Sequence, residues 1–135
     1  MKTYSKAELD IILEDHRKWL NREGGTKANL SRANLSGVNL SGVNLYRVNL
    51  SKADLYGCIG NMLEVKSMQI ETYYIAYTDS VLQIGCENHL IEEWKEFDNE
   101  TIHNMDENYA IDFWKKYKDY IFQTIELSPA EPTGH

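Results

Sequence analysis

Two cysteines and two histidines are the residues of this chain that could hold a metal ion or carry out nucleophilic catalysis. Cys86 and His89 have the spacing of half a metal site, and His103 and Cys58 could complete a set of four zinc ligands. The same residues could supply a cysteine nucleophile with a histidine base. A single C-x-x-H is weak evidence, however, and no recognisable pattern adds an orienting acid or oxyanion donors. We therefore predict no metal, no cofactor and no enzymatic activity.

Positive charge gathers in the first part of the chain, although the whole chain carries a formal net charge of −7. Residues 1–52 hold nine Lys or Arg against five Asp or Glu, a balance of +4, whereas residues 53–135 hold five against sixteen, a balance of −11. The acidic part would repel a nucleic acid, and the basic residues are too few for strong counterion release. Nucleic acid is therefore an unlikely partner, and an anionic small molecule or an acidic protein suits the basic part better.

Aromatic side chains offer a different chemistry, because a base or another flat ring can stack on them. Tyr46, Tyr56 and Trp94 are the candidates for such stacking. Packing inside a core or a cap is the commoner use of aromatic residues, and both interpretations stay open.

The elements that must position these residues begin with a helix. Ser5 followed by Glu8 fits a capping box, in which each side chain bonds to a backbone N–H at the start of the helix. Apolar residues then recur at helical spacing from Leu9 to Leu20, and glycines at 24 and 25 can end the helix. Residues 1–25 are therefore predicted to form an N-terminal capping helix.

The last part of the chain is predicted to change from strands to helices. Residues 63–88 are rich in β-branched and aromatic residues around a turn at 78–80, which predicts a hairpin whose returning strand reaches Cys86. Asn88 could then cap the first of the helices predicted over residues 89–127, the longest of which runs from about Glu107 to Glu126. Residues 128–135 are expected to pack against nothing and to form a flexible tail.

Between these parts, residues 26–62 repeat with a period of five, which matches neither a helix nor a strand. Each block has a leucine at its centre, a small apolar residue two places before it, and Asn or Asp directly before it. The fifth positions carry, in order, Arg, Gly, Gly, Arg, Lys and Gly. The central leucines are Leu30, Leu35, Leu40, Leu45, Leu50 and Leu55.

This pattern resembles the pentapeptide-repeat family, whose motif is A(D/N)LXX in tandem. The resemblance implies a mainly β solenoid, a right-handed quadrilateral β-helix with four blocks in each coil. Six blocks and their degenerate flanks make about two coils, too few to stand alone. We therefore expect one composite domain over residues 1–135, with the N-terminal helix capping one end of the β-helix and the C-terminal hairpin and helices capping the other.

A coil of four five-residue blocks would stack residues that are 20 apart in the sequence. It would place Lys27 over Arg47 and Arg32 over Lys52, two like-charged pairs that nothing structural requires. Solvated corners with splayed side chains are one interpretation, and an anion-binding site is the other. The remaining cations that could add to such a site are Arg17 and Arg22.

The sequence thus favours a non-enzymatic, cytoplasmic binding protein that captures an anionic ligand, such as a nucleotide signal, or an acidic partner surface. The C-terminal part is similar to an extension in some small pentapeptide-repeat proteins of bacteria and their phages, so a phage or mobile-element origin and sequestration of a host defence signal are worth testing. A protein-interaction or assembly module, including a homo-oligomer, is the alternative. Imitation of DNA at a topoisomerase, known for long acidic members of the family, is disfavoured because this repeat is short and basic. No apolar run is long enough to predict a membrane span.

Overall fold

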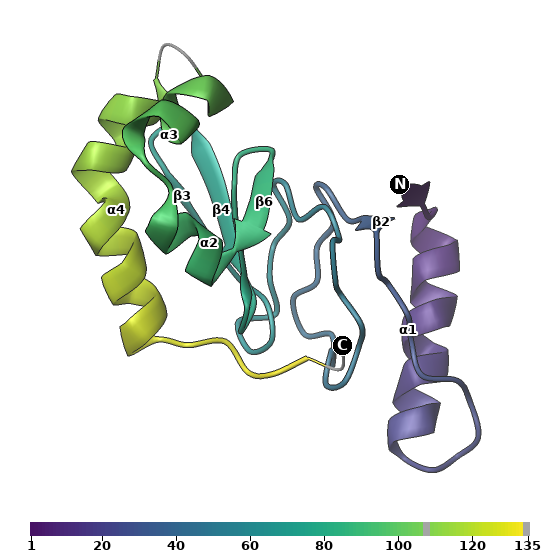
Figure 1. Cartoon of the computed structure of the whole chain (residues 1–135). Coiled ribbons are helices and arrows are strands. Elements are labelled where there is room, and N and C mark those ends of the chain that lie inside the picture. Colours follow the sequence, from purple (N-terminus) through teal and green to yellow (C-terminus); the bar gives the residue numbers. More distant parts are fainter. Residues whose placement is uncertain (107–108, 134–135) are drawn as a thin grey trace.

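The computed structural model describes residues 1–106 and 109–133. It begins with a short strand, β1 (Lys2–Thr3), and helix α1 (Lys6–Leu20) (Figure 1). The predicted capping box is confirmed: the backbone N–H of Glu8 donates to Ser5 Oγ at 3.1 Å, and the backbone N–H of Ser5 donates to Glu8 Oε1 at 2.9 Å. The bonds from Ser5 hold the pKa of the Glu8 carboxyl below its usual value. The helix therefore begins where the capping box of Ser5 and Glu8 predicts.

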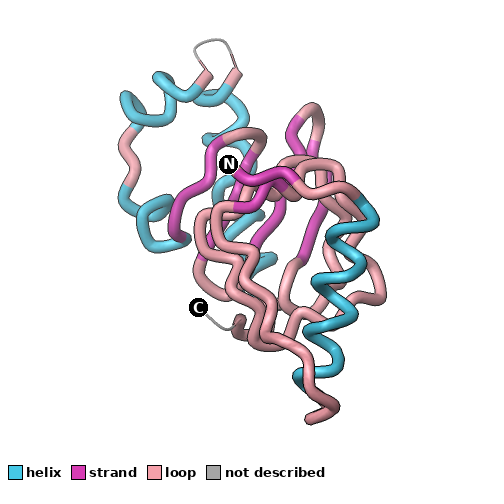
Figure 2. Tube along the Cα trace, turned by 90° about the vertical axis from the view of Figure 1, so that its right-hand side faces the viewer, coloured by secondary structure: helices cyan, strands magenta, loops and turns pink. Residues whose placement is uncertain are grey.

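The repeat segment follows, and its backbone pairs at a fixed interval. Isolated parallel bridges join Asn29 to Asn49, Asn34 to Asp54 and Asn39 to Ile59, and the two partners are 20 residues apart in each bridge. The one named strand here, β2 (Ala33–Asn34), pairs in parallel with β1, and the two lie side by side in Figure 2. The named strands of the described chain form two separate sheets, neither of which closes on itself.

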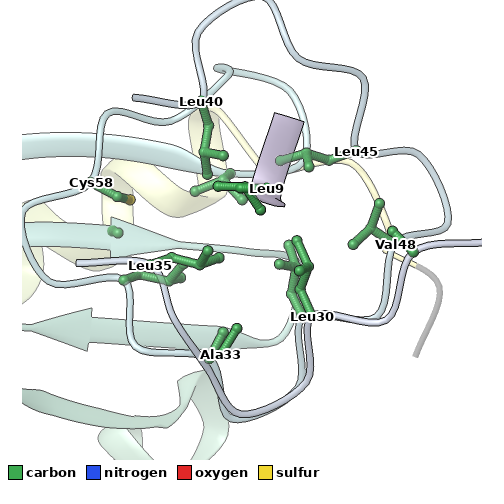
Figure 3. Close-up of a cluster of buried hydrophobic side chains, with 14 residues drawn as sticks. Leu9, Leu30, Ala33, Leu35, Leu40, Leu45, Val48 and Cys58 are labelled. Carbon is green, nitrogen blue, oxygen red and sulfur yellow. The ribbon is translucent and has the colours of Figure 1, made fainter. Parts of the chain in front are cut away.

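The side chains of the repeat divide between the interior and the turns. Leu30, Leu35, Leu40 and Leu45 are completely buried. Figure 3 shows these leucines pointing toward a common centre, with Leu9 of α1 among them. The Asn or Asp before the leucine accepts a hydrogen bond from the backbone N–H two residues later, as from Ser31 to Asn29 and in the equivalent pairs along the segment. These residues therefore form the turns of the repeat.

A four-stranded antiparallel sheet comes next, in the order β3 (Lys66–Ile70), β4 (Tyr73–Tyr77), β5 (Val81–Ile84) and β6 (Glu87–Leu90). The predicted hairpin around the turn at 78–80 is confirmed by the antiparallel pairing of β4 with β5, but its returning strand ends at Ile84 and does not reach Cys86. Gly85, with a φ of 57°, reverses the chain and starts a fourth strand. Asn88 therefore lies inside β6 and does not cap a helix. Its side-chain amide instead donates to the Ala53 carbonyl of the repeat at 2.9 Å.

Three helices cover the face of this sheet that is turned away from the repeat and α1 (Figure 1). They are α2 (Ile91–Glu96), α3 (Asn99–Met105) and α4 (Ala110–Leu127). Glu107, the predicted start of the last helix, lies outside the described residues.

The chain after α4 was expected to pack against nothing, and this is wrong for residues 128–131. Ala130 is buried, and the backbone N–H of Glu131 donates to the Leu63 carbonyl at 2.8 Å. The Tyr77 hydroxyl donates to the Ser128 carbonyl at 2.6 Å. Ala130 is small enough to enter the apolar core between the four-stranded sheet and its helices, which explains why a polar, proline-containing segment still packs.

Candidate functional site

The structure places three cations from separate parts of the chain side by side, and we call Lys2, Arg32 and Lys52 the cationic row. The parallel pairing of β1 and β2 aligns Lys2 with Ala33, and the backbone N–H of Lys2 donates to the Arg32 carbonyl at 3.3 Å. The backbone N–H of Arg32 donates in turn to the Ser51 carbonyl at 2.9 Å. All three side chains are exposed, and together with Met1 they line one shallow hollow in the surface.

Carboxylates neutralise the cationic row only weakly, through the exposed Glu8 carboxyl, whose pKa the charge of Lys2 helps to lower. No ion pair between residues that the structure describes includes Lys2, Arg32 or Lys52. The Lys2 ammonium has an aromatic neighbour, with Nζ 5.1 Å from the centroid of the Tyr4 ring. Like charges held close together repel one another, so an anion bound among them would be stabilised.

Two residues of the cationic row also have an unfavourable backbone conformation. Arg32 and Lys52 have φ angles of 60° and 58°, in the left-handed region, where a residue with a Cβ costs roughly 1–2 kcal/mol. The equivalent fifth positions of other blocks are glycines at similar φ, including Gly37 and Gly42. Glycine would have a lower conformational energy at all of these corners, so the backbone conformation does not explain the presence of cations there.

The second predicted pair lies at a different corner and has a structural neighbour. Lys27 Nζ and Arg47 Cζ lie 6.0 and 5.2 Å from the centroid of the Trp19 ring, and Trp19 stacks on His16 at 5.6 Å. Cation–π attraction to this indole joins the end of α1 to the repeat. The four cations predicted to form one site therefore separate into two groups, and Lys27 and Arg47 do not line the hollow of the cationic row.

Arg17 and Arg22 do not join the row either. The Arg17 guanidinium pairs with Glu14 at 2.8 Å and with Glu23 at 3.5 Å, and the hydrogen bonds that it donates to Glu14 raise the pKa of Arg17. Arg22 is exposed just beyond the end of α1, with a φ of 59°. Lys2 was missed by the sequence analysis, because its place depends on strand pairing across about 30 residues, which no local pattern predicts.

The three aromatic candidates lie in three different environments. Tyr46 is exposed beside α1, and its backbone carbonyl lies 2.8 Å from His16 Nε2. Tyr56 makes an edge contact with Tyr74 at 5.5 Å between ring centroids. Trp94 is only 2% exposed and donates its indole N–H to the Leu82 carbonyl at 2.7 Å. They do not form one stacking platform.

The candidate metal ligands are also apart. Within residues 1–106 and 109–133, no three His, Cys, Asp or Glu side chains are grouped closely enough to hold a metal ion. Cys58 is buried in the repeat core, where burial and the nearby Asp54 raise the pKa of its thiol to about 11. Cys86 is exposed, and His89 pairs with Glu87 at 3.0 Å.

Comparison with known proteins supports the assignment of the repeat. The family model for pentapeptide repeats matches residues 26–59, with eight copies. Comparisons with curated proteins and with solved structures gave no match. None of the described helices is long and apolar enough to cross a membrane.

Proposed function

We propose that this protein is a non-catalytic binding protein, which captures an anionic group on the cationic row. Residues 26–59 of the chain are pentapeptide repeats. Pentapeptide repeats generally serve as protein-interaction modules, and most proteins that carry them are not enzymes. The observation that carries the proposal is the alignment of Lys2, Arg32 and Lys52 around one hollow, with no ion pair to a carboxylate of the described residues.

We also propose that the repeat forms about two coils of a right-handed quadrilateral β-helix. The support is the spacing of the backbone contacts: the Leu30, Leu35 and Leu40 N–H groups each donate to a carbonyl 19 residues later, at 2.8–2.9 Å. These bonds belong to bridges whose partners are 20 residues apart, which is the length of four blocks of five residues. In such a coil β1 adds one further parallel strand beside β2, and this strand brings Lys2 to the corner that carries Arg32 and Lys52.

The chemistry of the row suits a phosphate or carboxylate group. A guanidinium binds such a group through two parallel N–H bonds, and ammonium groups on flexible stems can close around it. The same chemistry is offered by a nucleotide and by an acidic protein surface. Because the hollow is shallow and all three cations are exposed, either source can reach it.

The test is a pair of matched variants, Arg32→Gly and Arg47→Gly, measured by calorimetry with ATP, inorganic pyrophosphate and polyglutamate. Both substitutions remove one positive charge and place glycine at a left-handed corner, so each should raise the free energy of unfolding by up to about 1 kcal/mol. The loss of cation–π attraction to Trp19 reduces this gain for Arg47→Gly.

Of the two single variants, Arg32→Gly alone should weaken anion binding, by about tenfold. The double variant with Arg32→Gly and Lys52→Gly should abolish anion binding. If Arg32→Gly and Arg47→Gly lowered the affinity for the anion equally, net charge alone would explain the binding, and the proposal would be contradicted. Binding of ATP and pyrophosphate would identify a small-molecule ligand, and binding of polyglutamate alone would identify an acidic protein surface.

A further inference from the structure

The C-terminal part of the protein contains a cavity that the cationic row does not use. It lies between the four-stranded sheet and the helices that cover it, and its volume is about 170 Å³. The sheet contributes Tyr73 and Ile84, and the helices contribute Trp94, Phe113 and Trp114. Four of the eleven lining residues are aromatic, and Ile84, Ile102, Met105 and Ala110 add aliphatic surface, so the walls are mostly apolar.

The size of the cavity limits what can occupy it. An apolar cavity of about 150 Å³ accommodates one benzene ring and excludes water. A single aromatic ring is the group whose size and shape fit this cavity best.

The polar groups beside the cavity are hydrogen-bond acceptors. The Tyr73 hydroxyl donates to Asp106 Oδ2 at 2.7 Å, and burial together with this bond raises the pKa of the phenol, so the hydroxyl stays protonated. The carboxylates of Asp106 and Glu87 both line the cavity, and Glu87 already pairs with His89 at 3.0 Å. Each carboxylate can accept further hydrogen bonds, so a ligand at this side of the cavity must bring a donor.

The charge of the surroundings favours a cation. Residues 53–135 carry a balance of −11. The face of a tryptophan ring attracts positive charge, and the Lys118 ammonium already lies 5.9 Å from the Trp114 centroid. We propose that this cavity binds a small arylalkylamine, with its ring against the wall formed by Trp94, Phe113 and Trp114 and its ammonium group at Asp106.

The first experiment is an NMR titration of the whole protein with benzylamine. The chain has three tryptophans, so three indole N–H signals report separately on the cavity and on a distant control. The signals of Trp94 and Trp114 should shift in a saturable way, whereas that of Trp19, on α1, should not. Benzoate, with the opposite charge, and butylamine, without a ring, should bind at least tenfold more weakly. Absence of a saturable shift at millimolar benzylamine would overturn the proposal.

Variants then separate the cavity from a general acidic surface. Ala110→Leu places extra atoms in the cavity and should abolish binding of benzylamine. Asp106→Asn keeps an oxygen that can accept from Tyr73 but removes the negative charge. It should weaken the binding of benzylamine about tenfold and leave the binding of benzyl alcohol unchanged. Asp112→Asn, an exposed carboxylate of α4 that does not line the cavity, is the control and should have little effect.

Two outcomes would exclude this site. Unchanged benzylamine affinity in Ala110→Leu would show that the ligand binds elsewhere. Equal weakening in Asp106→Asn and Asp112→Asn would show that only the overall negative charge matters. The Asp106→Asn and Asp112→Asn comparison stands even if Ala110→Leu does not fold.

Discussion

The two ends of the repeat are covered in different ways. At the N-terminal end, α1 contributes one completely buried polar side chain, His16, whose Nδ1 accepts from the Ala28 N–H at 3.0 Å and whose Nε2 lies 2.8 Å from the Tyr46 carbonyl. At the C-terminal end, Glu64 Oε1 accepts from the Leu45 N–H at 3.0 Å, and Gln83 Oε1 accepts from the Leu55 N–H at 2.6 Å.

The C-terminal arrangement continues the bonding pattern of the repeat with different atoms. Leu30, Leu35 and Leu40 donate their N–H groups to backbone carbonyls 19 residues later. For Leu45 and Leu55, side-chain oxygens occupy the place of such carbonyls. A short stack of repeats can therefore end without unpaired buried donors, provided that the cap supplies acceptor oxygens at the right places.

The largest effect should come from Gln83→Leu at the C-terminal end. Gln83 is 2% exposed and also donates to Asp54 Oδ1 at 2.7 Å and to the Gly85 carbonyl at 3.1 Å. Its loss leaves the Leu55 N–H buried without an acceptor, so the free energy of unfolding should fall by about 3 kcal/mol in urea titrations. Gln69→Leu, at an exposed position of β3, is the control and should change it by less than about 0.5 kcal/mol. Similar values for the two variants would contradict the role of Gln83 as a substitute carbonyl.

His16→Leu at the N-terminal end should have the next largest effect. It removes the acceptor of the Ala28 N–H and the partner of the Tyr46 carbonyl but keeps an apolar side chain in the core. We expect a loss of about 2 kcal/mol in the same titration, smaller than for Gln83→Leu because fewer hydrogen bonds are broken. The matched control is His103→Leu, at an exposed position of α3. If His16→Leu lowered the free energy of unfolding more than Gln83→Leu does, the N-terminal end would be the more sensitive one, and this prediction would be contradicted.

The smallest effect is expected for Glu64→Gln. The amide keeps an oxygen that can accept from both the Leu45 N–H and the Asn61 side-chain amide, which lies 3.0 Å from Glu64 Oε1. If the end of the repeat needs an acceptor oxygen and not a charge, the free energy of unfolding should change by less than about 0.5 kcal/mol, against about 2 kcal/mol for Glu64→Leu. Equal losses in Glu64→Gln and Glu64→Leu would show that the negative charge itself stabilises this end.

Local patterns predicted much of the fold, and contacts between distant segments account for what they missed. The capping box at Ser5, the buried leucines and the turn-forming asparagines depend on residues within five positions of one another. The fourth strand was missed because a run of apolar residues does not show where Gly85 reverses the chain. The predicted anion site was divided in two because the helix brought Trp19 to one corner and β1 brought Lys2 to the other.

The sequence by itself determined the repeat, because a five-residue period, a central leucine and an Asn before it are enough to define each turn and its buried side chain. Tertiary structure alone decided what covers each end, which cations stand together and where a cavity remains. The physical reason is that backbone turns are satisfied within a few residues. The partners of the Leu55 N–H, of Arg32 and of Trp94 come from segments whose approach depends on the packing of the whole chain.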